Sequence, residues 1–134
     1  MRKRLAVAVV GMCLLAAIPA LAHHSFTSFW YMDKNVTIEG VVTELKLVNP
    51  HPTMKVEVTE NGQKNIWVIT ARATASAILK AGWSAETTPI GVRVRIEGNP
   101  SRREGAKALA AGKIIRLSDN KELSFGGVGG IPQG

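Results

Sequence analysis

The chain has 134 residues and a formal net charge of +7 at pH 7. Its first 22 residues carry three of the 17 Lys and Arg residues and none of the ten Asp and Glu residues, so residues 23–134 carry only +4. That charge is too weak and too dispersed to indicate a surface for polyanions. The single cysteine, Cys13, also lies in the first 22 residues, which excludes a disulfide, a thiolate metal site and a cysteine nucleophile from the rest of the chain.

The N-terminal segment has the three parts of a secretory signal peptide. Basic Arg2-Lys3-Arg4 precedes an apolar run over residues 5–17, and Ala20-Leu21-Ala22 is a small-x-small cleavage site. The apolar run is shorter than the about 20 residues that a membrane anchor needs. We therefore predict a signal peptide over residues 1–22, export to the periplasm, and no stable membrane span after cleavage.

The first predicted strand covers residues 36–48, and its pattern changes phase near Gly40. Ile38 and Val42 mark one face, whereas three other residues mark the opposite face: Val41, Leu45 and Leu47. A strand that exchanges faces around a glycine is typical of a strongly curled or bulged strand.

A turn, a strand and a hairpin follow. Asn49-Pro50-His51-Pro52 predicts a turn. Met54, Val56 and Val58 alternate with polar residues, as in a half-buried strand. Asn61-Gly62 predicts a tight hairpin turn into a third strand over residues 66–70.

The next segment is alanine-rich and predicts a short helix over residues 72–81, ended by Gly82. A fourth strand follows over 92–97, then a polar loop over 98–105. Residues 106–111 fit either a helical turn or the start of a fifth strand. The remaining elements are a fifth strand over 113–117, a turn over 118–121 that returns the chain toward Leu123 and Phe125, and a disordered glycine-rich tail over 126–134.

This order of elements predicts one mainly β domain over residues 23–125, a small five-stranded OB-like Greek-key barrel with one short helix between strands 3 and 4. The alternative is another small α+β roll with the same element order. Small barrels host many functions, so the fold alone assigns none.

Five motifs stand out along the domain: His23-His24-Ser25-Phe26, Gly40-Val41-Val42-Thr43, Asn49-Pro50-His51, Trp67 and Gly82-Trp83. With them the chain resembles a family of small exported proteins, a domain of unknown function found mostly in proteobacteria. The resemblance implies a periplasmic single-domain protein with an OB-like barrel and no established activity. An acidic residue is frequent in that family where this chain has Thr70, and Ser-Pro is frequent where it has Ala73-Thr74. A site role for that acidic residue therefore does not carry over.

The three histidines fall in the two most specific motifs. Cleavage after Ala22 makes His23 the first residue, and its free amine and imidazole form a chelate that suits Cu(II). His51 is the natural further donor, and His24 and Met54 complete the candidate set. In the alternative, the N-terminal histidine is merely tolerated by the peptidase and His51 caps a backbone carbonyl.

No nucleophile–base pattern or phosphate-binding glycine loop is present, so we predict no catalytic residues. Four of the seven aromatic residues crowd residues 26–31, and export makes nucleic acid an unexpected partner. We predict a non-catalytic periplasmic binding module whose partner is a small ligand, an envelope component or a protein. The alternative function is a copper-binding protein that uses His23, His51, and His24 or Met54.

Overall fold

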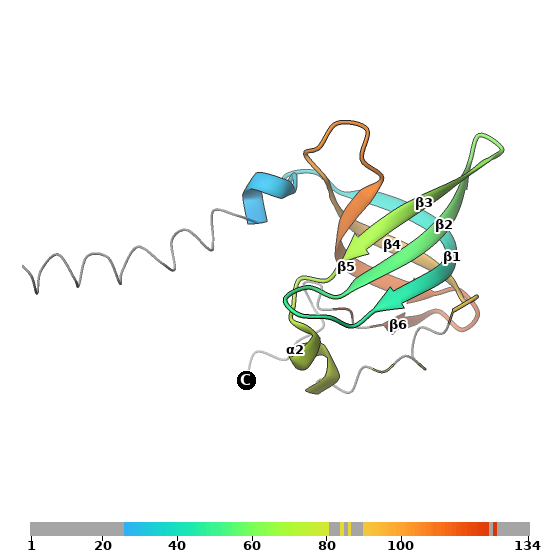
Figure 1. The fold of residues 1–134 in the computed structure, drawn as a ribbon. Coiled ribbons are helices and arrows are strands. Elements are labelled where there is room, and N and C mark those ends of the chain that lie inside the picture. The colour runs from blue at the N-terminus through green and yellow to red at the C-terminus, as the bar shows by residue number, and fades with distance from the viewer. Residues whose placement is uncertain (1–25, 81–83, 85, 87–89, 124, 126–134) are drawn as a thin grey trace, which may run out of the picture.

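The computed structural model describes residues 26–80, 84, 86, 90–123 and 125. A helical turn at residues 26–29 precedes a barrel that Figure 1 shows from its side. The elements are, in chain order, β1 (Val36–Lys46), β2 (Thr53–Glu60), β3 (Gln63–Thr70), α2 (Ala75–Lys80), β4 (Arg93–Pro100), β5 (Ala108–Arg116) and β6 (Lys121–Leu123).

The strands close into a barrel. Their order is β3-β2-β1-β4-β5-β6, with antiparallel pairing throughout this series. Closure comes from a parallel pairing of β3 with β5, in which Val68 faces Ala108 and Thr70 faces Ala110. The prediction of a five-stranded OB-like Greek-key barrel, with the helix between strands 3 and 4, is confirmed, and β6 is an additional strand paired with the second half of β5.

Alternating residues of the strands fill the barrel. On β2 the inward positions are Met54, Val56 and Val58, as their alternation predicts, and all three are buried. Ile78 of α2 packs into the same core, so the helix closes one end of the barrel (Figure 1). Burial of this apolar surface is the main source of stability in a domain whose described residues contain no cysteine.

The bulge of β1 lies at Thr43 and not near Gly40. The register of β1 against β2 shifts between Val42 and Glu44, which leaves Thr43 as the extra residue. Ile38 and Val42 face the core before the bulge, and Leu45 packs against the same core after it. The prediction that Leu45 and Leu47 lie on the face opposite Ile38 and Val42 is therefore wrong, because the bulge resets the alternation; Val41, before the bulge, lies on the opposite face as predicted.

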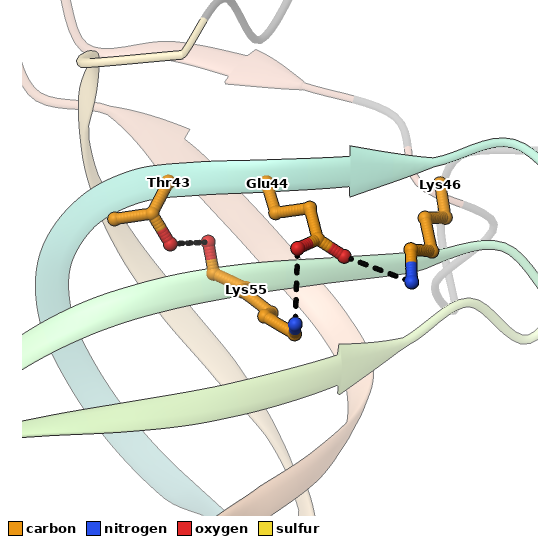
Figure 2. Close-up of polar contacts among 4 residues, drawn as sticks. All are labelled: Thr43, Glu44, Lys46 and Lys55. Atoms are coloured by element: carbon orange, nitrogen blue, oxygen red, sulfur yellow. Dashed lines mark hydrogen bonds and ion pairs between the residues drawn. The ribbon is translucent and has the colours of Figure 1, made fainter.

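Side chains at the bulge form a polar cluster on the outer surface (Figure 2). The Thr43 hydroxyl donates to the carbonyl oxygen of Lys55 at 3.3 Å. Glu44 forms ion pairs with Lys55 at 2.9 Å and with Lys46 at 3.2 Å. The hydrogen bond from Lys55, followed by that from Lys46, lowers the pKa of Glu44. The cluster thus joins β1 to β2 at the point where their register changes.

Gly40 is required by the close approach of β2. A Cβ atom at this position would lie 2.3 Å from the carbonyl oxygen of Glu57 and 2.7 Å from a methyl carbon of Val56. The Asn61-Gly62 hairpin turn is confirmed, since both residues have positive φ, 50° and 77°, as a type I′ turn demands.

Boundaries in the second half differ from prediction. β4 continues through Pro100, so the predicted polar loop over 98–105 is too long at its start. β5 begins at Ala108, which decides between the alternatives for 106–111 in favour of a strand. The helix is shorter than predicted, because the Thr74 hydroxyl accepts a hydrogen bond from the amide of Ala77 and caps it.

Three predictions fall on residues outside the described ones: the signal peptide over residues 1–22, the end of the helix at Gly82 and the disordered tail over 126–134. No helix in the described part of the chain is long and apolar enough to cross a membrane.

Candidate functional site

The segment before the barrel is bound to the loop between β4 and β5. Trp30 forms an isolated antiparallel bridge with Ser101, and the Tyr31 amide donates to the carbonyl oxygen of Pro100 at 2.9 Å. The backbone amide of Arg102 donates to the carbonyl oxygen of Phe29 at 2.8 Å. The aromatic N-terminal segment is therefore part of the folded domain, and Figure 1 shows it beside this loop.

A partly buried polar network holds the same segment from the barrel side. Nδ2 of Asn99 donates to the carbonyl oxygens of Tyr31 at 3.0 Å and Lys34 at 2.6 Å. Asn99 Oδ1 accepts a hydrogen bond from Arg72, whose Nε donates to the carbonyl oxygen of Ala111 at 2.7 Å. Burial lowers the pKa of Arg72, because a guanidinium loses its hydration there. Asn99 and Arg72 thus tie β4, β5 and the N-terminal segment together.

Between this segment and the barrel lies a cavity of about 290 Å³, which we call the aromatic cavity. Its lining residues are Phe26, Phe29, Trp30, His51, Thr70 and Ser101. The rings of Phe26 and Trp30 lie 6.2 Å apart at a tilt of 38°, and the Phe29 ring is 65% exposed. The cavity therefore combines an apolar aromatic wall with one imidazole and two hydroxyl groups.

The turn that carries His51 is fixed at both ends. Asn49 Oδ1 accepts a hydrogen bond from the amide of Ala75 at 3.1 Å, and the Pro52 carbonyl oxygen accepts one from Ala71 at 2.9 Å. The peptide bond between Asn49 and Pro50 is cis. Asn49 is therefore structural, whereas the exposed His51 imidazole hydrogen-bonds to no other described residue. The alternative in which His51 caps a backbone carbonyl does not occur among those residues.

The cavity has the position of the ligand site in OB folds. His51 belongs to the loop between β1 and β2, Ser101 to the loop between β4 and β5, and Thr70 ends β3. These two loops and this part of the sheet form the usual binding face of the fold.

The predicted metal ligands fall into three groups. His51 lines the aromatic cavity, and Met54 is fully buried in the barrel core. His23 and His24 lie outside the described residues. Within the described part of the chain, no three His, Cys, Asp or Glu side chains are grouped as metal ligands.

Sequence reasoning did not single out Thr70 or Ser101 as site residues. Each is a common polar residue far from His51 in the chain. The β2–β3 hairpin pairs Thr70 with Thr53, two residues after His51, whereas the pairing of β3 with β5 brings the loop of Ser101 to the same place. The one available signal was the crowding of aromatic residues over 26–31, which gives half of the cavity wall.

No curated protein matches this chain. The family model described as "Family of unknown function (DUF6152)" matches residues 12–110, which include the N-terminal segment, β1 to β4, the cavity and the start of β5. That match covers well over half of the sequence, and it agrees with the resemblance to a domain of unknown function. The chain therefore belongs to the DUF6152 family, a family of unknown function.

Proposed function

We propose that this protein is a non-catalytic periplasmic binding module that holds a small ligand in the aromatic cavity. The observation that carries the proposal is the joint contribution of three separate segments to one cavity on the OB binding face. Phe26 and Trp30 come from the N-terminal segment, His51 from the β1–β2 loop and Ser101 from the β4–β5 loop. Apolar walls with a few convergent polar groups are typical of small-molecule sites.

The size of the cavity indicates the size of the ligand. Small-molecule sites have volumes of roughly 300–1,000 Å³, and this cavity, at about 290 Å³, is at the lower end. A ligand built on a single ring system fits that volume. Its ring would pack against Trp30 and Phe26, and its polar group would reach His51, Thr70 or Ser101.

The proposed periplasmic location rests on the three-part leader of residues 1–22.

The proposal is tested by a fragment screen on exported, processed protein, read out by amide chemical shifts. Ring-containing fragments are expected to shift the amide signals of Thr70 and Ser101. Phe29→Ala is expected to lower the affinity for these fragments at least about threefold, because it removes aromatic contact area. Phe29 is 65% exposed, so its loss leaves the core intact. The matched control is Ile66→Ala, an exposed apolar residue of β3 outside the cavity. Shifts confined to other surfaces, or equal effects of the two variants, contradict the proposal.

Copper binding is a second candidate, supported by the closeness of Phe26 and His51. Both residues line the aromatic cavity. His23 precedes Phe26 by three residues, which span at most about 11 Å when extended. An amine and imidazole at His23 are thus within chain reach of the His51 imidazole, and His24 supplies a further donor. Met54 is left out of this set, because its side chain is fully buried in the core.

A Cu(II) competition titration tests the second candidate. Processed wild type is compared with His51→Ala and with a variant that carries one extra residue before His23. Loss of at least about tenfold in affinity, equivalent to about 1.4 kcal/mol, is expected for both variants. Any peptide that begins with histidine binds some copper, so equal binding by wild type and His51→Ala contradicts a shared site.

A further inference from the structure

Two guanidinium groups lie next to residues that line the aromatic cavity. Arg102 follows the lining residue Ser101, and its Nε atom donates to the carbonyl oxygens of Thr27 at 2.7 Å and Trp30 at 3.1 Å. The Cζ atom of Arg72 lies 5.4 Å from the ring centroid of Phe26, another lining residue. Positive charge is therefore placed next to the site from the β4–β5 loop and from the segment that follows β3.

Carboxylates do not neutralise these two cations. All ten Asp and Glu residues belong to the described part of the chain. The ion pairs formed there use other cations, namely Lys46, Lys55, Lys64, Lys107, Arg95 and Arg116. Arg72 and Arg102 donate instead to backbone carbonyl oxygens and to the amide oxygen of Asn99. An arginine stays protonated in a protein, so both keep their full charge beside the cavity.

Free donors remain on the more exposed cation. Among the described residues, Arg102 uses its backbone amide and Nε, and its Cζ stacks 4.5 Å from the Tyr31 ring centroid. Its two Nη groups make no hydrogen bond to a described residue. A planar guanidinium held in this way is suited to a carboxylate, because two parallel N–H donors match its two oxygens.

From these charges we propose that the aromatic cavity selects small aromatic anions, such as a carboxylate attached to a single ring. The inference rests on the proposed binding function and names the ligand class for that same site. The ring packs against Phe26 and Trp30, while the anionic group accepts hydrogen bonds from Arg102 and from the Ser101 hydroxyl. Cations of similar shape are disfavoured, because they would add positive charge beside Arg72 and Arg102.

Three probes of nearly the same shape separate charge from ring packing. Exported, processed protein is titrated with benzoate, benzamide and benzylammonium, and amide shifts of Thr70 and Ser101 give each dissociation constant. Benzoate is expected to bind at least about tenfold more tightly than the other two, as a hydrogen bond to a charged group adds that much. Its affinity is expected to fall as salt is added, because salt screens an exposed cation.

Two arginine variants provide the matched comparison. Arg102→Ala is expected to weaken benzoate roughly tenfold more than it weakens benzamide, because loss of the Nε hydrogen bonds to Thr27 and Trp30 affects both probes and loss of the charge affects benzoate alone. Arg103→Ala removes the same charge from the same loop, and the Arg103 side chain forms no hydrogen bond or ion pair with a described residue. The Arg103→Ala variant is expected to retain at least half of the wild-type affinity for benzoate. Arg102→Lys keeps the charge but loses the two parallel donors, so it is expected to show a smaller preference for benzoate over benzamide than wild type.

The outcomes distinguish this inference from the proposed function on which it rests. Equal binding of benzoate and benzamide in the cavity overturns anion selection and leaves a binding module in place. Equal losses in Arg102→Ala and Arg103→Ala overturn the assignment to Arg102. If none of the three probes shifts the lining residues, both the anion preference and the binding of small ring ligands are wrong.

Discussion

The Asn99 side-chain oxygen accepts a hydrogen bond from Arg72, and the Asn99 side-chain nitrogen donates to the carbonyl oxygens of Tyr31 and Lys34. One amide group thus links a partly buried cation to the segment that forms the aromatic wall of the cavity. Neither Asn99 nor Arg72 lines the cavity itself. The shape of the site depends on this amide, because it fixes where the N-terminal segment lies.

Asn99→Ala is expected to lower the free energy of unfolding by roughly 1–3 kcal/mol, because Arg72 and two carbonyl oxygens lose a partly buried hydrogen-bond partner. Urea denaturation gives the free energy, and hydrogen exchange shows whether residues 26–34 lose protection first. Asn35→Ala is the control, since Asn35 is exposed and its side chain forms no hydrogen bond with a described residue. Similar values for the two variants would show that the amide does not anchor the segment.

Truncation of Met54 is expected to lower the stability of the fold strongly, whereas truncation of His51 is expected to leave it nearly unchanged. Met54 is fully buried, so Met54→Ala should cost roughly 2–5 kcal/mol of unfolding free energy through a cavity in the core. His51 is exposed, and His51→Ala should change stability by less than about 0.5 kcal/mol. Thermal and urea denaturation measure the stability of both variants.

A separate prediction concerns Met54 and copper. Met54→Leu preserves the core and should leave the Cu(II) affinity unchanged. A loss of affinity would return Met54 to the set of copper ligands.

Gly40→Ala is expected to destabilise the barrel by about 3 kcal/mol, since the new methyl group would overlap the backbone of β2 and force overpacking. The comparison is Gly62→Ala in the hairpin turn, where a Cβ atom meets nothing within 4 Å and only the positive φ of 77° is strained. That variant should cost about 1 kcal/mol. Equal costs in urea denaturation would show that β2 can move away from Gly40.

The stability of the domain is expected to fall in acid partly through Asp119. The hydrogen bond from Arg116 lowers the pKa of Asp119 from 3.8 to about 2 in the folded protein. A carboxyl whose pKa is lower in the folded state stabilises the fold above its unfolded pKa, and that contribution is lost as the pH falls from about 4 toward 2. Urea midpoints between these pH values should therefore decline less steeply for Asp119→Asn than for wild type. Glu122→Gln is the control, because Glu122 forms no ion pair with a described residue.

Much of the barrel follows from local sequence signals. The alternation of Met54 and Val56 requires only that one face of β2 be buried, and the Asn61-Gly62 turn requires only that two adjacent residues adopt positive φ. The bulge at Thr43 was misplaced because its position depends on the register with β2, which Gly40 does not specify. The start of β5 was ambiguous because runs of alanine suit a helix equally well, and pairing with β3 decides for a strand.

The candidate site was predictable only in part. His51 stood out because histidine is rare in this chain and lies in a defined turn. Thr70 was missed because its place beside His51 depends on the register of the β2–β3 hairpin, in which Thr70 pairs with Thr53. Ser101 carries no local signal, since barrel closure brings its loop to the site. Asn99 and Arg72 were also missed, because their importance lies in partners 27 to 68 residues away.

The strand β6 protects an edge that barrel closure leaves open. β3 pairs with only the first part of β5, up to Ala110, and β6 covers the backbone groups of Ile114 to Arg116. Without β6, those unpaired groups would be available to a strand from a second molecule. The outer edge that β6 itself presents is three residues long and includes Lys121 and Glu122, a length and charge that discourage such pairing. A chain cut before residue 121 would lose this cover together with the buried side chains of Leu123 and Phe125, and would thus be prone to self-association.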